Sequence, residues 1–141
     1  MNSYLVTGAA GFIGANVAQA LLDAGYEVVG VASLNDYYDV DLMHYRLKPL
    51  LNHFGFSFVR GDLADGQIVD SLFAQHDFDC VIHVAAQAGV RYSLENPGAY
   101  IQCNIVGFQH LIDACRSKPP AHLVFASSSS VYGNSDMAWF S

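Results

Sequence analysis

Short apolar runs alternate with longer amphipathic segments along the 141 residues of this chain. The segments between the apolar runs carry apolar side chains every three or four residues, which is the period of a helix. The predicted strands are 4–8, 27–32, 56–61, 79–86 and 121–127. The predicted helices are 11–25, 36–52, 64–76 and about 97–116, and Pro49 is expected to limit the second of them.

This alternation predicts a parallel sheet, because strands that alternate with helices form βαβ units with right-handed crossovers. The run 79–86 is apolar on both faces, as expected for a strand that helices cover on both sides. We therefore predict an α/β protein with a Rossmann-type, doubly wound parallel sheet of five strands in the order 3-2-1-4-5. Its switch point, where ligands bind in such sheets, falls between the first and fourth strands.

Composition narrows the class of protein. Hydrophobic residues make up 52% of the chain and the formal net charge is −7, which favours a folded domain and argues against nucleic acid as a partner. The length suits one domain over 1–141. The apolar run 4–22 is broken by glycines and polar residues, so we expect no membrane span. The six histidines do not cluster at metal-ligand spacing, so we expect no metal site.

Targeting and redox features indicate the cytoplasm. The first basic side chain is Arg46, so the positive start of a secretory signal is missing. The three cysteines, Cys80, Cys103 and Cys115, lie far apart and suggest buried thiols in a reducing compartment.

The stretch TGAAGFIG (7–14) between the first strand and the first helix is typical of a phosphate-binding turn. Gly8 permits a tight turn, Gly11 lets the backbone approach a pyrophosphate, and Gly14 lets the helix pack on the strand. The helix N-terminus supplies unpaired N–H groups for the phosphates. A glycine-rich turn without a ligand remains the alternative. The predicted cofactor contacts in this turn are Gly8, Ala10, Gly11, Phe12, Ile13 and Gly14.

Several motifs together resemble the extended short-chain dehydrogenase/reductase superfamily. They are TGAAGFIG (7–14), GDLAD (61–65), HVAAQAGVRYS (83–93) and SSSSVYG (127–133). Within it, LNDYYDV (34–40) and AAQAGVRYSLENPGAY (85–100) resemble the UDP-glucuronate 4-epimerases and other nucleotide-sugar epimerases. The likeness implies an enzyme that holds NAD tightly, oxidises a sugar at C4 and returns the hydride to the other face.

The resemblance also implies roles for matching positions. Asp62 and Leu63 would meet the adenine, and Asn104 would support the active-site side of the cofactor. Ser128 would be the catalytic residue that hydrogen-bonds the reacting hydroxyl. The positions that would line the cofactor beyond the fourth strand are Ala85, Ala86 and Gln87, and those near the nucleotide-sugar are Arg91, Ser93 and Ser129.

Plainer roles stay open for some of these residues. Asp62 could be only the N-cap of the helix that starts near Ala64. Asn104 could be a structural helix residue. His83, inside an apolar strand, is expected to be a hydrogen-bonded core histidine rather than a ligand or base.

The end of the second strand departs from the resemblance. Ala32 stands where relatives carry the aspartate that binds the ribose, and Ser33 stands where asparagine is usual. Loss of a charge-assisted hydrogen bond costs about 1.5–3 kcal/mol, or about 10- to 100-fold in affinity. No arginine follows to hold a 2′-phosphate, and Asp36 is near. We therefore expect weakened NAD binding rather than a switch to NADP, which is left open.

The second departure concerns the family's Tyr-x-x-x-Lys base. No tyrosine follows Tyr132 and no lysine follows Lys118, so Ser128 stands without its partners. We expect the amino-terminal, NAD-binding part of a nucleotide-sugar epimerase, truncated before its substrate portion and inactive alone. An exposed apolar edge at 121–127 would favour self-association. The alternatives are a non-catalytic dinucleotide-binding module, or a fragment of a nucleotide-sugar dehydratase or reductase.

Overall fold

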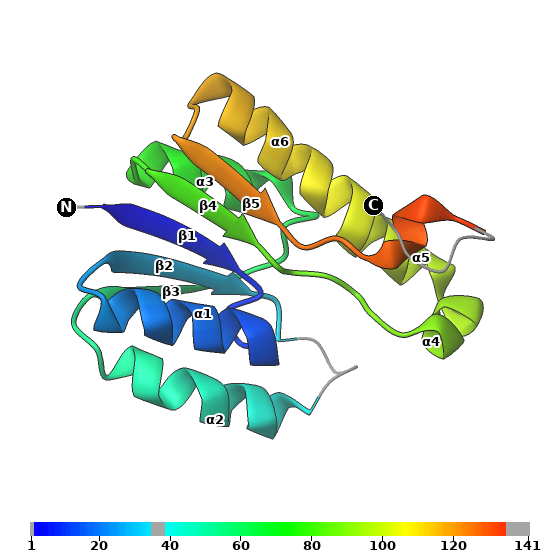
Figure 1. Cartoon of the computed structure of the whole chain (residues 1–141), viewed down its shortest axis with the longest axis horizontal. Coiled ribbons are helices and arrows are strands. Elements are labelled where there is room, and N and C mark those ends of the chain that lie inside the picture. Colours follow the sequence, from blue (N-terminus) through cyan, green and yellow to red (C-terminus); the bar gives the residue numbers. More distant parts are fainter. Residues whose placement is uncertain (1, 35–38, 135–141) are drawn as a thin grey trace.

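A five-stranded parallel sheet forms the centre of the protein, with helices on both of its faces (Figure 1). The computed structural model describes residues 2–34 and 39–134. The strands are β1 (Ser3–Thr7), β2 (Glu27–Ala32), β3 (Phe56–Arg60), β4 (Cys80–His83) and β5 (His122–Phe125). Their order is β3-β2-β1-β4-β5, which confirms the predicted topology.

The switch point lies at the central strand. Thr7, the last residue of β1, is paired with Val31 of β2 on one side and with His83 of β4 on the other. The chain leaves β1 toward one half of the sheet and returns in β4 on the other half. The carboxyl ends of β1, β2 and β4 therefore meet at one edge of the sheet, where α/β folds place their ligands.

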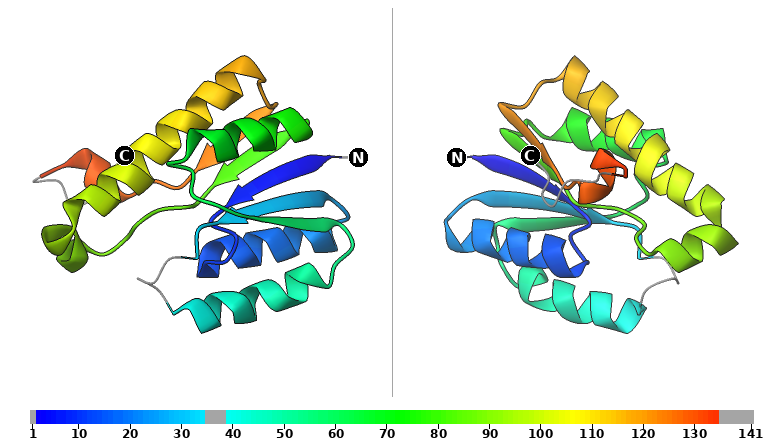
Figure 2. Two further views of the ribbon diagram at one scale, coloured as in Figure 1. Left: turned by 180° about the vertical axis from the view of Figure 1, so that it is seen from behind. Right: turned by 45° about the vertical axis from the view of Figure 1, so that its right-hand side comes forward.

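Each face of the sheet is covered by a pair of helices, as the two views in Figure 2 show. Helices α1 (Phe12–Asp23) and α2 (Val40–Leu51) cover one face. Helices α3 (Gly66–Gln75) and α6 (Gly107–Ser117) cover the other.

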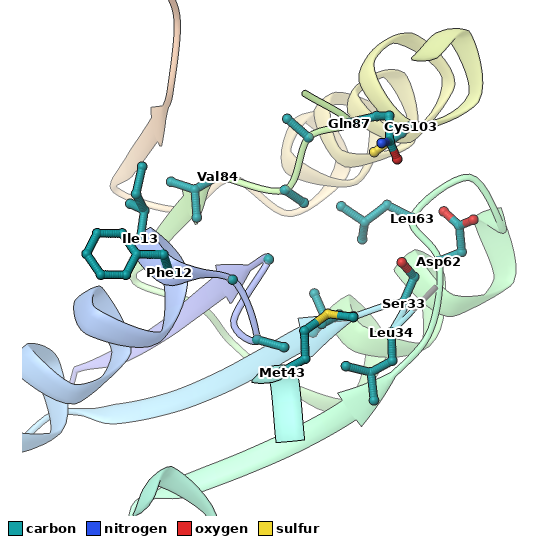
Figure 3. Close-up of a pocket in the computed structure, with 18 of the residues that line it drawn as sticks. Phe12, Ile13, Ser33, Leu34, Met43, Asp62, Leu63, Val84, Gln87 and Cys103 are labelled. Carbon is teal, nitrogen blue, oxygen red and sulfur yellow. The ribbon is translucent and has the colours of Figure 1, made fainter. Parts of the chain in front are cut away.

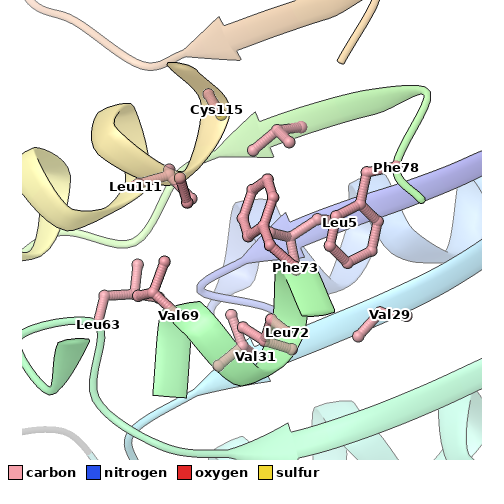
Figure 4. Close-up of a cluster of buried hydrophobic side chains, with 12 residues drawn as sticks. Leu5, Val29, Val31, Leu63, Val69, Leu72, Phe73, Phe78, Leu111 and Cys115 are labelled. Carbon is pink, nitrogen blue, oxygen red and sulfur yellow. The ribbon is translucent and has the colours of Figure 1, made fainter. Parts of the chain in front are cut away.

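The core has two layers because successive strand side chains point to opposite faces. Leu5 belongs to the cluster under α3 and α6, together with Phe73 and Leu111 (Figure 4). Its neighbour Val6 belongs to the cluster under α1 and α2. The side chains of Leu5 and Val6 are both fully buried.

Some boundaries differ from the prediction. Strand β4 ends at His83 rather than Ala86, because the N–H groups of Val84 and Ala85 donate to the Thr7 hydroxyl instead of continuing the ladder. Pro49 does not end α2, which continues to Leu51. The first residues of the predicted helix 36–52 and Asp36 itself lie outside the described residues.

The predicted helix 97–116 consists of three pieces. Helix α5 (Pro97–Tyr100) leads into a π-helical segment, η1 (Ile101–Val106), and then into α6. A π segment forms i to i+5 hydrogen bonds, and periodicity on either side of it does not reveal it. The sequence analysis predicted neither α4 (Val90–Glu95) nor the 3₁₀ turn η2 (Ser129–Tyr132).

The outer edge of the sheet exposes apolar surface. Among the described residues strand β5 pairs only with β4, and Val124 and Phe125 are 53% and 52% exposed. The apolar edge expected from the sequence is therefore present. Within the described residues no helix is both long and apolar enough to cross a membrane.

Candidate functional site

A cleft of about 460 Å³ opens at the carboxyl ends of the central strands (Figure 3). This volume lies within the range of small-molecule sites, which is about 300–1,000 Å³. Its walls are formed by segments that are far apart in the sequence. Met43 and Arg46 of α2 and Cys103 of η1 also line it. These segments are the glycine turn at 8–14, the end of β2 at 31–34, and the loops at 61–63 and 84–88.

The glycine turn has no room for a side chain at Gly8 or Gly14. Gly8 has a φ of +67°, and a Cβ there would lie 3.0 Å from the backbone of Ala85. A Cβ on Gly14 would lie 2.0 Å from the carbonyl oxygen of Gly8, which excludes any other residue. The Gly11 N–H donates to the same oxygen at 3.0 Å and closes the turn. The turn therefore places bare backbone against the cleft.

Helix α1 begins at this cleft without a cap. Gly11 occupies its N-cap, no side chain in the described part of the chain hydrogen-bonds there, and the first turn carries no acid. By contrast, Asp39 caps α2 and Asp65 caps α3. The first N–H groups of an α-helix have no acceptor inside the helix. The start of α1 therefore offers free donors and partial positive charge to an anion in the cleft.

Thr7 fixes the opposite wall of the cleft. Its buried hydroxyl accepts hydrogen bonds from the N–H groups of Val84 and Ala85, each at 3.0 Å. Its oxygen also lies 2.8 Å from Nδ1 of His83. Since two donors occupy the oxygen's lone pairs, the hydroxyl proton donates to Nδ1, which places the histidine proton on Nε2.

His83 is a core histidine, as expected from the sequence. It is 7% exposed, and its ring stacks on Phe108 with centroids 5.0 Å apart. Burial lowers the pKa of its imidazole, so the neutral form that accepts from Thr7 is favoured.

Asn104 holds the backbone of Gln87 through two hydrogen bonds. Its Oδ1 accepts from the Gln87 N–H at 2.9 Å, and its Nδ2 donates to the Gln87 carbonyl at 3.0 Å. Gln87 lines the cleft and is 6% exposed, yet its Nε2 finds no acceptor in the part of the chain that the structure describes. A ligand with an oxygen or ring nitrogen in the cleft would supply that acceptor, so the donor set fits a dinucleotide.

Asp62 lies at the rim of the cleft. Its Oδ1 accepts from the Ala64 N–H at 2.9 Å, but the N-cap of α3 is Asp65, so the N-cap alternative for Asp62 is wrong. Its carboxylate stays exposed on the cleft side. Burial raises the pKa of the nearby Cys103 thiol, and the Asp62 charge raises it further.

The structure brings most of the predicted residues together. Every predicted cofactor residue except Asn104 lines the cleft, and Asn104 acts on it through Gln87. The predicted catalytic and substrate residues do not line it. Ser128 is exposed and precedes the turn η2, which contains Ser129.

The other two substrate candidates lie on helix α4. Arg91 is exposed, and the Ser93 hydroxyl donates to the carbonyl of Val90.

Sequence reasoning missed several lining residues, including three that come from helices other than α1. Met43 and Arg46 reach the cleft from α2, and Cys103 reaches it from η1. The three-residue spacing of Met43 and Arg46 places them on one helix face, which is the signal that could have joined them. The guanidinium carbon of Arg46 lies 5.9 Å from the centroid of the Phe12 ring. Among the described residues, no group of three or more His, Cys, Asp or Glu side chains could hold a metal ion.

Comparison with known proteins places this chain among nucleotide-sugar enzymes. It is 49% identical over 132 residues to UDP-glucuronate 4-epimerase 2 of Arabidopsis thaliana, covering 93% of this chain and 30% of that protein. It is 45% identical over 130 residues to a probable UDP-glucuronate 4-epimerase of Rhizobium meliloti, covering 92% and 38% respectively. The chain thus spans well under half the length of these relatives.

Solved structures agree. The UDP-glucuronic acid 4-epimerase from Bacillus cereus, in complex with UDP-glucuronic acid and NAD, matches with a TM-score of 0.87 and 36% identity. That match covers 98% of this chain and 44% of the other. The UDP-Glc/GlcNAc 4-epimerase from Campylobacter jejuni matches with a TM-score of 0.85 and 28% identity, covering 97% and 40%.

Nearly the whole sequence matches one protein family. Residues 5–141 match the family described as GDP-mannose 4,6 dehydratase. The chain therefore belongs to this family of nucleotide-sugar epimerases and dehydratases, and it matches the amino-terminal part of its epimerase relatives.

Proposed function

We propose that this chain is the NAD-binding part of a nucleotide-sugar epimerase that acts on UDP-glucuronate. The observation that carries the proposal is the uncapped start of α1, which opens into a cleft at the switch point of a parallel sheet. The similarity to UDP-glucuronate 4-epimerases supports the choice of sugar. Its three cysteines are free thiols, which supports a cytoplasmic location.

Each wall of the cleft has a role in holding the dinucleotide. The N–H groups at the start of α1 bind the pyrophosphate, and Asp62 and Leu63 contact the adenine. Gln87 Nε2 donates to the ligand, and Asn104 keeps Gln87 in place. Bound NAD would supply the hydride acceptor and donor for oxidation and re-reduction of the sugar. Because Ala32 offers no acceptor to the ribose hydroxyls, NAD binds about 10- to 100-fold more weakly than it would beside an acid.

The chemistry needs more than these residues supply. Ser128 is proposed to hydrogen-bond the reacting hydroxyl, with Arg91, Ser93 and Ser129 near the nucleotide-sugar. The 141 residues contain no Tyr-x-x-x-Lys, the motif expected to take the hydroxyl proton. We therefore propose that this polypeptide alone does not turn over UDP-glucuronate. Formation of the C4 epimer by excess protein with NAD would contradict that proposal.

A dehydratase is the second candidate, because the family that matches residues 5–141 is described by that activity. A dehydratase eliminates water from its nucleotide-sugar, whereas an epimerase only inverts a carbon. Supplying the missing residues from a full-length relative as a fusion, and analysing the product mass, separates the two. An unchanged mass supports the epimerase, and a loss of water supports the dehydratase.

The binding part of the proposal is tested by placing a negative charge where the pyrophosphate would lie. Ile13 is 60% exposed, lines the cleft and sits in the first turn of α1. Ile13→Glu should weaken NAD binding at least about 10-fold in calorimetry, because the carboxylate occupies the anion site and repels phosphate. An acid in the first turn suits the helix dipole, so folding should be preserved.

The matched control is Ala20→Glu, which adds the same charge to an exposed position on the same helix, away from the cleft. It should bind NAD like the wild type. Equal affinity of the two variants would refute the placement of the pyrophosphate. Absence of heat with both NAD and NADP at millimolar concentration would refute dinucleotide binding altogether.

A further inference from the structure

A side chain of α6 reaches the loop between β3 and α3, which forms part of the cleft wall. Nδ1 of His110 lies 2.8 Å from the carbonyl oxygen of Leu63. A carbonyl oxygen can only accept, so Nδ1 carries the proton and donates it to this bond. The bond joins residues 47 positions apart in the sequence, and it therefore fixes where the loop lies relative to α6.

The loop has few other links to the rest of the protein. Within the described residues, and apart from its bonds to α3, the loop 61–65 makes two hydrogen bonds to other elements. At its start, the Gly61 N–H donates to the Ala32 carbonyl at 3.0 Å. In its middle, the Leu63 carbonyl accepts from α6. The histidine is therefore the anchor for the part of the loop that faces the cleft.

Packing reinforces this anchor. Gly107 lies three residues before His110 and so shares its face of α6. A Cβ at Gly107 would lie 3.2 Å from the Cβ of Leu63, so the missing side chain lets the helix approach the loop closely. The His110 ring also lies against the start of α3, since a Cβ at Gly66 would be 3.5 Å from its Cε1. The imidazole is thus held between the loop and a second helix.

The loop carries the acid of the cleft. Asp62 and Leu63 both line the cleft, and Figure 3 shows them side by side on this loop. Among the described lining residues Asp62 is the only acid, and it is exposed. A carboxylate accepts from the exocyclic amino group of adenine but not from hypoxanthine, which carries an oxygen there. Because hydrogen bonds require a donor–acceptor distance near 3 Å, the position of the loop decides whether this bond forms.

We propose that His110 is a positioning residue for recognition of the adenine base. Through its hydrogen bond to Leu63, it holds the loop where the Asp62 carboxylate accepts from the adenine amino group. The inference rests on the proposed function, because it takes the ligand of this cleft to be an adenine dinucleotide. It adds that recognition of the base depends on a side chain of α6 that does not itself line the cleft.

The experiment compares NAD with nicotinamide hypoxanthine dinucleotide, in which an oxygen replaces the adenine amino group. In calorimetric titration the whole wild-type chain should bind NAD at least about 10-fold more tightly. His110→Leu should weaken NAD binding at least about 10-fold and change binding of the analogue by less than about 3-fold. His110→Asn should keep the preference within about 3-fold of the wild type, because its amide nitrogen can donate from the place of Nδ1.

Two further variants complete the test. His44→Leu is the matched control, because it removes an exposed histidine of α2 outside the cleft, and it should leave both affinities unchanged. Gly107→Ala reaches the same loop by another route. Gly107 has helical backbone angles, which alanine favours, so folding should be preserved. Its new Cβ presses on Leu63 and should lower the preference for NAD at least about 3-fold.

The outcomes separate this inference from the proposed function. Equal weakening of both ligands by His110→Leu, or loss of the preference in His110→Asn, would reduce the histidine to a structural role and overturn the inference. An unchanged preference in folded His110→Leu or Gly107→Ala, or no preference in the wild type, would also overturn it and leave dinucleotide binding standing. Failure of the wild type to bind either ligand would overturn both.

Discussion

Replacing Thr7 by valine tests whether one hydroxyl joins the centre of the sheet to the wall of the cleft. Valine keeps the shape of threonine but removes the oxygen that accepts from Val84 and Ala85 and donates to His83. Each buried polar group that loses its partner costs about 1–3 kcal/mol. The N–H groups of Val84 and Ala85 belong to partly exposed residues, where water can replace some of the loss.

We therefore expect Thr7→Val to lower the free energy of unfolding by roughly 2–4 kcal/mol. For a chain of this length that corresponds to roughly 6–20 °C in melting temperature. Thr7→Ser is the matched control, since it keeps the hydroxyl and loses one buried methyl group, worth about 1 kcal/mol. Urea unfolding followed by circular dichroism measures both variants.

Amide hydrogen exchange gives a local readout. In Thr7→Val the N–H groups of Val84 and Ala85 should exchange faster relative to those of β4, because their acceptor is gone. Dinucleotide binding should also weaken, since Ala85 lines the cleft. A valine variant as stable as the serine variant, with unchanged protection of these two amides, would show that the hydroxyl does not hold the wall.

Two further results are expected. Burial lowers the pKa of His83, so on acidification the unfolded chain takes up this proton before the folded chain does. The free energy of unfolding should therefore fall as the pH drops below about 6.5, and it should level off below the pKa of the folded state. Denaturant unfolding of His83→Gln across this range should show a flatter dependence, and an unchanged profile would contradict the assignment. At the sheet edge, Val124→Lys should reduce self-association in analytical ultracentrifugation because a charge blocks edge pairing, and an unaltered mass distribution would place the contact elsewhere.

The sheet order and the glycine turn could be read from the sequence because both depend on local signals. The alternation of strand and helix leaves few topologies, and the close approach of Gly14 to Gly8 needs only the turn itself. Most of the cofactor residues followed from motifs next to strand ends, which converge at one edge in any sheet of this order.

The remaining features depend on contacts between distant segments. The end of β4 is set by a side chain of β1, Thr7, which draws Val84 and Ala85 out of the ladder. Arg46 reaches the cleft because α2 packs beside α1, and its spacing from Met43 in the sequence indicates only that the two residues share a helix face. Motif matching placed Ser128 after β5, but it could not tell that this serine lies outside the cleft lining.

The hydrogen bonds from Val84 and Ala85 to Thr7 at the switch point also determine where cofactor choice can arise. A wall fastened to the central strands by buried hydrogen bonds meets every ligand in one shape, so no binding energy is consumed in ordering it. Mutations that reshape that wall would also disturb the packing of the central strands. On the opposite rim, where β2 ends and α2 passes, Ser33 is exposed and Ala32 and Arg46 are partly exposed, so selectivity between cofactors can be altered at these positions at less cost to folding.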